Sequence, residues 1–241
     1  MKLIQCDNCS KFFDGICAFE AIDFSINRGE IISLIGESGS GKSTIAECIS
    51  GIKNLTTGKV TKIANLKMQY IFQNPGRSFN PKWQMGKSLL EPLKLSKKLE
   101  NSTQIDVYLD KLKLDKQLLT QYPHECSGGQ KQRLAIIRAI LCEPDLIIAD
   151  EVTSGLDSEN EQELLKIFKE ISLSGVAILF ITHNIKTIEN FSDQVIVLKQ
   201  GKIVEKAITK TILDAPKQDY TQKLLAASHY FTSRRKEFVR I

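Results

Sequence analysis

The nine residues from Gly36 to Thr44 have the types and spacing of a loop that binds phosphate groups. They match the pattern G-x-x-x-x-G-K-[ST]. Glycine tolerates positive φ and has no Cβ, so such a loop curls tightly and points successive N–H groups at phosphate oxygens. Lys42 would reach the β- and γ-phosphates of a nucleotide, and the Ser43 hydroxyl would bind Mg²⁺. The candidate nucleotide-binding residues are Gly36, Glu37, Ser38, Gly39, Ser40, Gly41, Lys42, Ser43 and Thr44.

Two adjacent acids follow a second apolar run. Asp150 and Glu151 come directly after residues 146–149, a continuous apolar stretch of the kind that is buried in parallel sheets. In a chain with a phosphate loop, this pair suggests a metal-binding carboxylate and a general base. Without the loop, the same pair would indicate only a helix cap.

Two further polar residues also lie at predicted strand ends. His183 follows the apolar run 176–181, and Gln73 follows the short strand predicted at 68–72. Ligands of open α/β sheets bind at the carboxyl ends of the strands, which favours a functional His183, although a lone histidine is often structural. Gln73 could contact Mg²⁺ or an attacking water, or it could be an ordinary loop residue.

The elements that must position these residues can be predicted from periodicity. The phosphate loop lies between an apolar β-branched strand at 31–35 and a helix that buries Ile45, Cys48 and Ile49 and ends at Gly51. A period-two strand is expected at 22–26, turns at 27–30 and 57–59, and a hairpin over 195–204. Residues from about 85 to 141 are expected to be mostly helical, with Ile105, Tyr108, Leu109 and Leu112 on one face, and Ser158 and Glu161 are expected to form a capping box.

Composition favours one compact domain in the cytosol, or one held at a membrane by a partner. The chain has 241 residues, of which 42% are hydrophobic and 25% charged, and it contains no apolar run of the ~18–20 residues that cross a membrane. Its start has no features of a signal peptide. The net charge is +5, and the basic cluster at 234–240 is expected to be a solvated tail rather than a nucleic-acid site. Cys6 and Cys9 have no second pair at zinc spacing, so reduced structural thiols are favoured over a metal site.

The order of the motifs resembles that of an ATP-binding cassette (ABC) ATPase, the engine subunit of ABC transporters, over nearly the whole chain. The most specific motif is Ser127-Gly128-Gly129-Gln130, which resembles the family's signature. By itself it could be a helix start that binds an anion, or simply a Ser N-cap. The other matches are Gln73 of the Q-loop, Asp150 and Glu151 of Walker B, Leu156 and Asp157 of the D-loop, His183 as the switch histidine, and Phe13 as the adenine-stacking aromatic, which from position alone would be a core residue.

A narrower resemblance points to the oligopeptide, dipeptide and nickel importers. It rests on the segment from Phe72 to Pro81, on Glu91-Pro92-Leu93, on residues 122–125 before the signature, and on the tail at 216–225. Cys126 stands where the signature usually has Leu, and Val152 where Pro commonly follows the Walker B glutamate. Both positions flank the motifs, so activity is expected to be retained. No cysteine follows Cys142, so the iron–sulfur cluster of some relatives is not expected.

The resemblance implies an α/β fold of the P-loop NTPase (RecA-like) type, with a mixed sheet core, an antiparallel β subdomain and an inserted α-helical subdomain. The core would span about 1–75 and 145–208, the helical subdomain about 76–144, and a short tail 209–241. Asp150, Ser43 and Gln73 would hold Mg²⁺, Glu151 would be the base, and His183 and Gln73 would order the attacking water. The signature residues would bind the γ-phosphate of ATP held by a second cassette.

The expected partners are a related, non-identical ATPase subunit, two membrane-spanning permease subunits and an extracytoplasmic substrate-binding protein, with this chain at the cytoplasmic face of the membrane. The cargo could be peptides, nickel or a chelated metal. The rival is a cassette ATPase acting on nucleic acid or ribosomes, which predicts a coiled-coil insertion or a tandem cassette; the chain shows neither. A non-hydrolysing module predicts a broken acid, lysine or histidine, and a GTPase predicts an Asn-Lys-x-Asp motif; neither pattern occurs.

Overall fold

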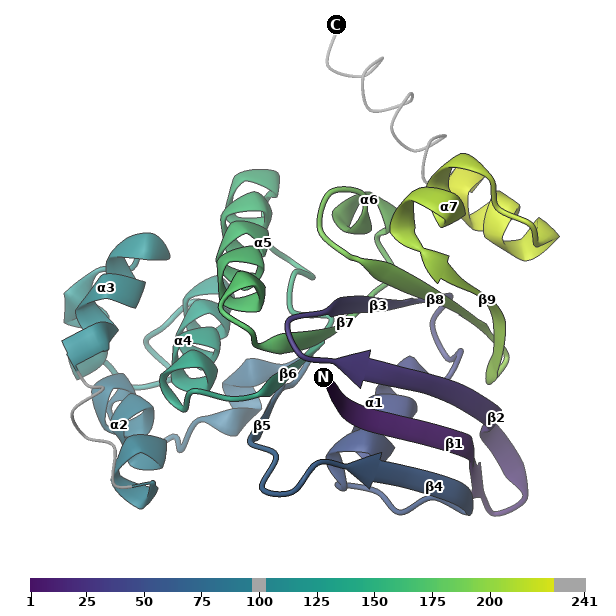
Figure 1. Ribbon diagram of the computed structural model, residues 1–241. Coiled ribbons are helices and arrows are strands. Elements are labelled where there is room, and N and C mark those ends of the chain that lie inside the picture. The colour runs from purple at the N-terminus through teal and green to yellow at the C-terminus, as the bar shows by residue number, and fades with distance from the viewer. Residues whose placement is uncertain (97–102, 228–241) are drawn as a thin grey trace, which may run out of the picture.

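Two sheets form the frame of the protein (Figure 1). The computed structural model describes residues 1–96 and 103–227, and it contains a three-stranded sheet in the order β2-β1-β4 and a six-stranded sheet in the order β5-β6-β7-β3-β8-β9. The small sheet is antiparallel. The strands are β1 (Lys2–Phe13), β2 (Ile16–Asn27), β3 (Ile31–Ile35), β4 (Thr57–Lys62), β5 (Met68–Ile71), β6 (Leu146–Asp150), β7 (Ala177–Thr182), β8 (Gln194–Lys199) and β9 (Lys202–Ile208).

The large sheet is parallel except for β9, which returns antiparallel to β8. Parallel neighbours end at the same edge of a sheet. Strand β6 ends in Asp150, and the segments that follow β3, β5, β6 and β7 carry the phosphate loop, Gln73, Glu151 and His183. One edge of the sheet therefore gathers the predicted phosphate- and metal-binding residues. The mixed sheet with a separate antiparallel sheet is the predicted architecture.

Helix α1 (Lys42–Ser50) packs between the two sheets (Figure 1). Its predicted apolar face, Ile45, Cys48 and Ile49, is buried against residues of both sheets. Gly51 ends the helix in the left-handed conformation at φ 90°, which a glycine adopts without the steric cost of a Cβ. Helix α1, which begins within the phosphate loop, is therefore fixed by packing against both sheets.

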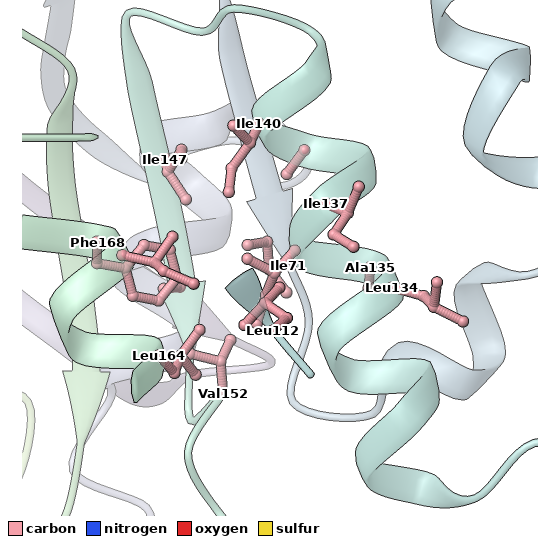
Figure 2. Packing of buried hydrophobic residues seen from close by; sticks show 14 of the residues in the cluster. Ile71, Leu112, Leu134, Ala135, Ile137, Ile140, Ile147, Val152, Leu164 and Phe168 are labelled. Atoms are coloured by element: carbon pink, nitrogen blue, oxygen red, sulfur yellow. The ribbon is translucent and has the colours of Figure 1, made fainter. Parts of the chain in front are cut away.

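The other face of the large sheet is covered by helices (Figure 2). Successive strand side chains point to opposite faces, so Ile147 and Phe180 face these helices, whereas Ile148 and Leu179 face α1. Helices α4 (Gly128–Leu141) and α5 (Ser158–Leu173) contact the sheet, and α2 (Met85–Leu95) and α3 (Gln104–Lys111) pack on α4. Short 3₁₀ turns lie at Pro75–Ser78 and Lys116–Thr120. Figure 2 shows Ile137 and Ile140 of α4 and Phe168 of α5 in this cluster around Ile147.

A third cluster joins the C-terminal part of the chain to the phosphate loop. Helix α6 (Ile185–Ile188), α7 (Thr209–Asp214) and a helical segment at 219–227 pack on β8, β9 and Ile35, the residue that precedes the loop. The basic residues at 234–240 lie outside the described residues. Within the described part of the chain, no helix is both long enough and apolar enough to span a bilayer.

Two local predictions were wrong in detail. Residues 57–59 form the start of β4 rather than a turn, because they pair with Asp7 and Ser10 of β1. The region from 85 to 141 is mostly helical in its described residues, as predicted, and is divided into separate helices and turns. The N-cap of α5 is Asp157 rather than Ser158: its carboxylate accepts the Asn160 N–H at 2.9 Å. Aspartate and serine cap equally well, so the pattern allowed both readings.

A β-bulge buries both cysteines of the C-x₂-C pair. Strand residues three apart normally face opposite sides, yet Cys6 and Cys9 are both buried. The pairing of β1 with β2 shifts between them, and Asn8 has a positive φ of 45°. Burial raises the pKa of both thiols, and the Cys9 thiol donates to the Lys59 carbonyl at 3.2 Å. Both side chains thus behave as packed, protonated thiols.

The bulge also makes Gly58 sensitive to substitution. A Cβ on Gly58 would lie 2.2 Å from the Asn8 carbonyl oxygen, whereas one on Gly15 would meet nothing within 4 Å. Their φ angles are nearly equal, +83° and +82°, so both Ala variants carry the same left-handed strain of about 1–2 kcal/mol. We expect Gly58→Ala to lower the free energy of unfolding by a further ~1–3 kcal/mol. Denaturant unfolding of the two variants measures this difference, and equal losses would contradict it.

Candidate nucleotide-binding site

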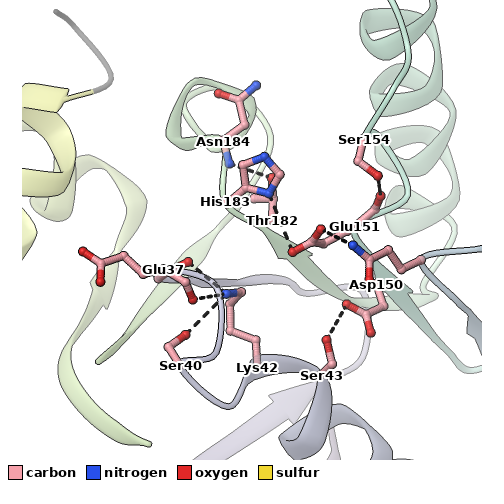
Figure 3. A network of polar contacts seen from close by, with 12 residues as sticks. Glu37, Ser40, Lys42, Ser43, Asp150, Glu151, Ser154, Thr182, His183 and Asn184 are labelled. Atoms are coloured by element: carbon pink, nitrogen blue, oxygen red, sulfur yellow. Dashed lines mark hydrogen bonds and ion pairs between the residues drawn. The ribbon is translucent and has the colours of Figure 1, made fainter. Parts of the chain in front are cut away.

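The Lys42 ammonium lies beneath the phosphate loop, with its side chain almost completely buried (Figure 3). Its Nζ donates to the carbonyls of Gly36 at 2.9 Å and Glu37 at 2.8 Å, and to the Ser40 hydroxyl at 3.3 Å. These acceptors are all uncharged. Desolvation lowers the pKa of Lys42, and the nearby Glu151 and Asp150 carboxylates partly oppose this shift. A buried positive charge whose bonded acceptors are neutral favours an anionic ligand.

Two loop glycines are required by the fold itself. A Cβ on Gly36 would lie 2.2 Å from the Leu198 carbonyl oxygen of β8, and one on Gly41 would lie 2.5 Å from the Ala18 carbonyl oxygen of β2. Their φ angles are +150° and +100°. Gly39, at φ +78°, has nothing within 4 Å of a Cβ position. Two neighbouring strands therefore hold the loop from outside at Gly36 and Gly41. At Gly39 the positive φ of the turn itself favours glycine.

Asp150 lies at the end of β6 with both carboxylate oxygens occupied. The Ser43 hydroxyl donates to Oδ1 at 3.1 Å, and the Tyr70 hydroxyl donates to Oδ2 at 2.9 Å. Burial raises the pKa of Asp150, and the two hydrogen bonds oppose that shift. Burial also raises the pKa of Tyr70, which keeps its hydroxyl a donor. A hydroxyl and a carboxylate are oxygen ligands of the kind that Mg²⁺ prefers, so the donor set fits this metal.

Glu151 is held in an uncommon backbone conformation beside Asp150. Its φ is 49°, in the left-handed region, and its N–H donates to the Ile181 carbonyl at 3.0 Å. Gln73 Nε2 donates to Glu151 Oε2 at 2.7 Å, and His183 Nδ1 lies 3.6 Å from Oε1 (Figure 3). Non-glycine residues at positive φ cluster at functional sites. The structure thus brings the predicted Gln73, Glu151 and His183 together.

These residues open onto one cavity of about 550 Å³. Its volume lies in the usual range for small-molecule sites. Its lining combines the phosphate loop with the three polar residues just described: Ala18, Ser38, Gly39, Gly41, Lys42, Ser43, Thr44, Gln73, Glu151 and His183. A loop of N–H groups, a buried ammonium and an oxygen pair for a divalent cation fit a nucleoside triphosphate with Mg²⁺.

Phe13 is close in sequence to Ala18, which lines the cavity, but Phe13 itself does not line it. It ends β1, pairs with Ile16 across the hairpin, and is 39% exposed. The ammonium groups of Lys11 and Lys53 lie 4.8 Å and 5.1 Å from its ring centroid. Ala18, on the other strand of the hairpin, is the residue that reaches the cavity.

The signature residues lie elsewhere on the chain, at the start of α4, and none of them lines the cavity. Ser127 caps the helix: its hydroxyl accepts the Gln130 N–H at 3.2 Å, and the Gln130 side chain accepts the Ser127 N–H at 2.7 Å. A Cβ on Gly128 would meet nothing within 4 Å, and one on Gly129 would make only an ordinary contact with Leu156 at 3.7 Å. Unlike Gly36 and Gly41, these glycines are not demanded by the chain's own packing.

Two site residues were not predicted. Tyr70 could have been suspected, because alternation along β5 and β6 places it on the same face as Asp150. Tyr220 could not: it lies in the tail, and its hydroxyl accepts the N–H of Glu37 in the phosphate loop at 3.3 Å. The Lys199 ammonium lies 4.9 Å from its ring centroid. The C-terminal segment therefore touches the outer side of the loop.

A carboxylate holds the start of that segment. Glu205 of β9 accepts the N–H of Lys217 at 2.9 Å and of Gln218 at 3.2 Å, at the start of the helical stretch 219–227. Burial acts to raise the pKa of Glu205, but these N–H groups outweigh it and hold the pKa below its usual value. The ionised carboxylate is the form that holds the tail.

Comparison with known proteins assigns the family. The profile of the ABC transporter family matches residues 19–154. The chain is 38% identical to the oligopeptide transport ATP-binding protein OppF of Lactococcus lactis subsp. lactis (strain IL1403), over 89% of this chain and 73% of that protein. It is 33% identical to the dipeptide transport ATP-binding protein DppF of Escherichia coli (strain K12), over 88% of this chain and 69% of that protein.

Solved structures give the same assignment. An ATP-binding subunit of an ABC transporter superposes with a TM-score of 0.82 at 25% identity, over 94% of this chain and 99% of that one. A dimeric, post-hydrolysis ATP-binding cassette bound to ADP and Pi superposes with a TM-score of 0.76 at 26% identity, over 86% of this chain and 99% of that one. The chain belongs to the ABC transporter ATPases, in the group of the peptide-importer subunits. The nucleic-acid alternative gains no support from these matches.

The Glu205 anchor can be tested by hydrogen exchange. Glu205→Ala should speed exchange of the Lys217 and Gln218 amides about fivefold or more, because each loses a charge-assisted acceptor. Glu189→Ala, at an exposed acid that directly follows α6, is the matched control and should change neither amide. In the wild type, the pKa of Glu205 is lower in the folded than in the unfolded state, where it is about 4.3. The anchor therefore stabilises the fold fully above that unfolded-state pKa, and this stabilisation is lost as the pH falls through the folded-state pKa. Unchanged exchange in Glu205→Ala would contradict the anchor.

Proposed function

We propose that the cavity at the phosphate loop binds ATP with Mg²⁺, and that hydrolysis there drives the import of peptides through a membrane complex. The observation that carries the proposal is the meeting of Lys42, Gln73, Glu151 and His183 at one cavity. The peptide cargo is supported by the relatives, which are named as oligopeptide and dipeptide transport proteins. Nickel or a chelated metal is the alternative cargo.

Each side chain has a proposed role that its contacts support. The loop N–H groups and Lys42 bind the β- and γ-phosphates. Ser43, Asp150 and the amide oxygen of Gln73 hold Mg²⁺, which when bound neutralises phosphate charge. Glu151 takes the proton of the attacking water, and its two oxygens are oriented by Gln73 at 2.7 Å and His183 at 3.6 Å. Positioning and charge neutralisation account for most of the rate in phosphoryl transfer.

Phe13 is proposed to stack on the adenine. Its ring is partly exposed at the tip of the β1–β2 hairpin, and the same hairpin brings Ala18 to the cavity. A nucleotide whose phosphates lie on the loop would extend its base toward this hairpin. Lys11 and Lys53 beside the ring limit where the base can lie.

The signature is proposed to bind ATP held by a second cassette. Ser127 and Gly128 are exposed, and the space around the two glycines is not filled by this chain. Gly128 and Gly129 would let a phosphate approach the N-terminus of α4, where free N–H groups and the helix dipole favour an anion. Asp157, which caps α5, would lie at the same contact. A head-to-tail pair agrees with the dimeric state of the related cassette that was solved with ADP and Pi.

The membrane subunits are proposed to dock at the surface that runs from Gln73 to Pro81 and continues onto the helices after it. Asn74 and Asn80 are exposed on this segment, and Phe72, which precedes it, is 42% exposed. The chain would thus lie at the cytoplasmic face of the membrane as a peripheral subunit, with two permeases, a related cassette and an extracytoplasmic binding protein as partners.

Glu151→Gln tests the proposed base. The amide keeps the size of the side chain but cannot take a proton, so the ATPase rate of the assembled complex should fall about 10²–10⁴-fold. ATP should still bind, and an ATP-bound pair of cassettes should accumulate in size-exclusion chromatography. Asp150→Asn is the comparison variant, and it should weaken Mg²⁺-dependent binding as well as turnover. Near-normal hydrolysis by Glu151→Gln would refute the assignment.

Gly128→Ala tests the signature proposal apart from the fold. A Cβ there meets open space in this chain, and alanine favours helix by up to about 1 kcal/mol. The melting temperature and ATP binding by the chain's own phosphate loop should therefore be unchanged or higher. The ATPase rate of the assembled complex should fall at least about tenfold, because the methyl group occupies the space proposed for the partner's γ-phosphate. Full activity would contradict a binding role for Gly128.

A further inference from the structure

We propose that Tyr70 is a positioning residue for Asp150 and thereby sets the affinity of the site for Mg²⁺. The proposal rests on the metal-binding role proposed for Asp150 and adds a residue outside the predicted motifs. Tyr70 Oη donates to Asp150 Oδ2 at 2.9 Å, while Ser43 Oγ donates to Oδ1 at 3.1 Å. The carboxylate is thus held by one donor on each of its two oxygens.

The contact follows directly from the register of the sheet. Tyr70 pairs with Ile148 and Ile71 pairs with Ala149 in the parallel ladder of β5 and β6. Alternation then places Tyr70, Ile148 and Asp150 on the face that packs on α1, whereas Ile71 and Ala149 belong to the opposite cluster. A tyrosine side chain is long enough to reach the carboxylate two residues further along the neighbouring strand.

Aromatic stacking fixes the position of the tyrosine hydroxyl. The ring of Tyr70 stacks on Phe72 with centroids 4.4 Å apart and an interplanar angle of 28°. Gln73, the next residue, donates to Glu151. The end of β5 therefore contacts both adjacent acids, Asp150 through Tyr70 and Glu151 through Gln73.

Tyr70 differs from Ser43 in one respect that matters for the metal. Ser43 is itself a proposed metal ligand, so its hydroxyl serves both the metal and Asp150 when Mg²⁺ binds. Tyr70 holds the far oxygen of the carboxylate and has no other proposed task. A ligand that is oriented by a second group binds its metal more tightly than one that is free to rotate.

The test is Mg²⁺ dependence in Tyr70→Phe, with Tyr108→Phe of α3 as the matched control. Binding of a fluorescent ATP analogue to the full chain is titrated with MgCl₂, and is also measured in EDTA. Loss of one hydrogen bond to a charged group should raise the half-saturating Mg²⁺ concentration about 3- to 10-fold in Tyr70→Phe. Nucleotide binding in EDTA should remain at the wild-type value in Tyr70→Phe. In Tyr108→Phe, both the half-saturating Mg²⁺ concentration and the binding in EDTA should remain at wild-type values.

The outcomes separate this proposal from the proposed function. If Asp150→Asn weakens Mg²⁺ dependence and Tyr70→Phe does not, the positioning role of Tyr70 is refuted and the metal site stands. If Asp150→Asn leaves Mg²⁺ dependence unchanged, the metal role of Asp150 itself fails. If Tyr70→Phe lowers the affinity for the ATP analogue equally with and without Mg²⁺, the proposal is also refuted, because such a loss would indicate a role of Tyr70 in the fold. Phe72→Leu, which removes only the stacking, should give a smaller shift in the same direction.

Discussion

A lysine ammonium buried among uncharged acceptors is the interaction on which the rest of the structure depends. Lys42 is bonded to two loop carbonyls and a hydroxyl, with the acids of β6 near enough to offset part of its desolvation. A cation in this setting is costly unless an anion joins it. The loop that surrounds it is held by β8 at Gly36, by β2 at Gly41 and by the tail at Glu37.

Glycines in this chain serve two distinct purposes, and the structure separates them. Gly36 and Gly41 have no room for a Cβ, because backbone carbonyls of neighbouring strands occupy that space. Gly128 and Gly129 have that room, and leave it open at a helix start. The first pair shapes the site within one chain, and the second pair leaves an unfilled surface, which is the surface proposed to receive the ATP of a second cassette.

The sequence predicted those features that depend on local pattern or on strand order. The phosphate loop and the strand ends that carry Gln73, Asp150 and His183 follow from apolar runs and from the common edge of a parallel sheet, whereas the mixed sheet was predicted from the family resemblance. Residues 57–59 were misassigned because turn-forming residue types also start strands. Tyr70 and Tyr220 were missed because their roles arise from contacts 80 and 183 residues away in the chain, with Asp150 and Glu37. The contact of Tyr70 requires the register of β5 against β6 in addition to the alternation, and the contact of Tyr220 carries no local signal.

The most direct test of the account is nucleotide-dependent stabilisation of the purified chain, wild type against Lys42→Ala. ATP at 100 times its dissociation constant stabilises a binding protein by about 2.7 kcal/mol. We predict that ATP with Mg²⁺ raises the melting temperature of the wild type, that AMP does not, because it lacks the β- and γ-phosphates, and that Lys42→Ala loses most of the ATP shift. An equal shift with AMP, or an unchanged ATP shift in Lys42→Ala, would contradict the claim that the buried ammonium binds the phosphates.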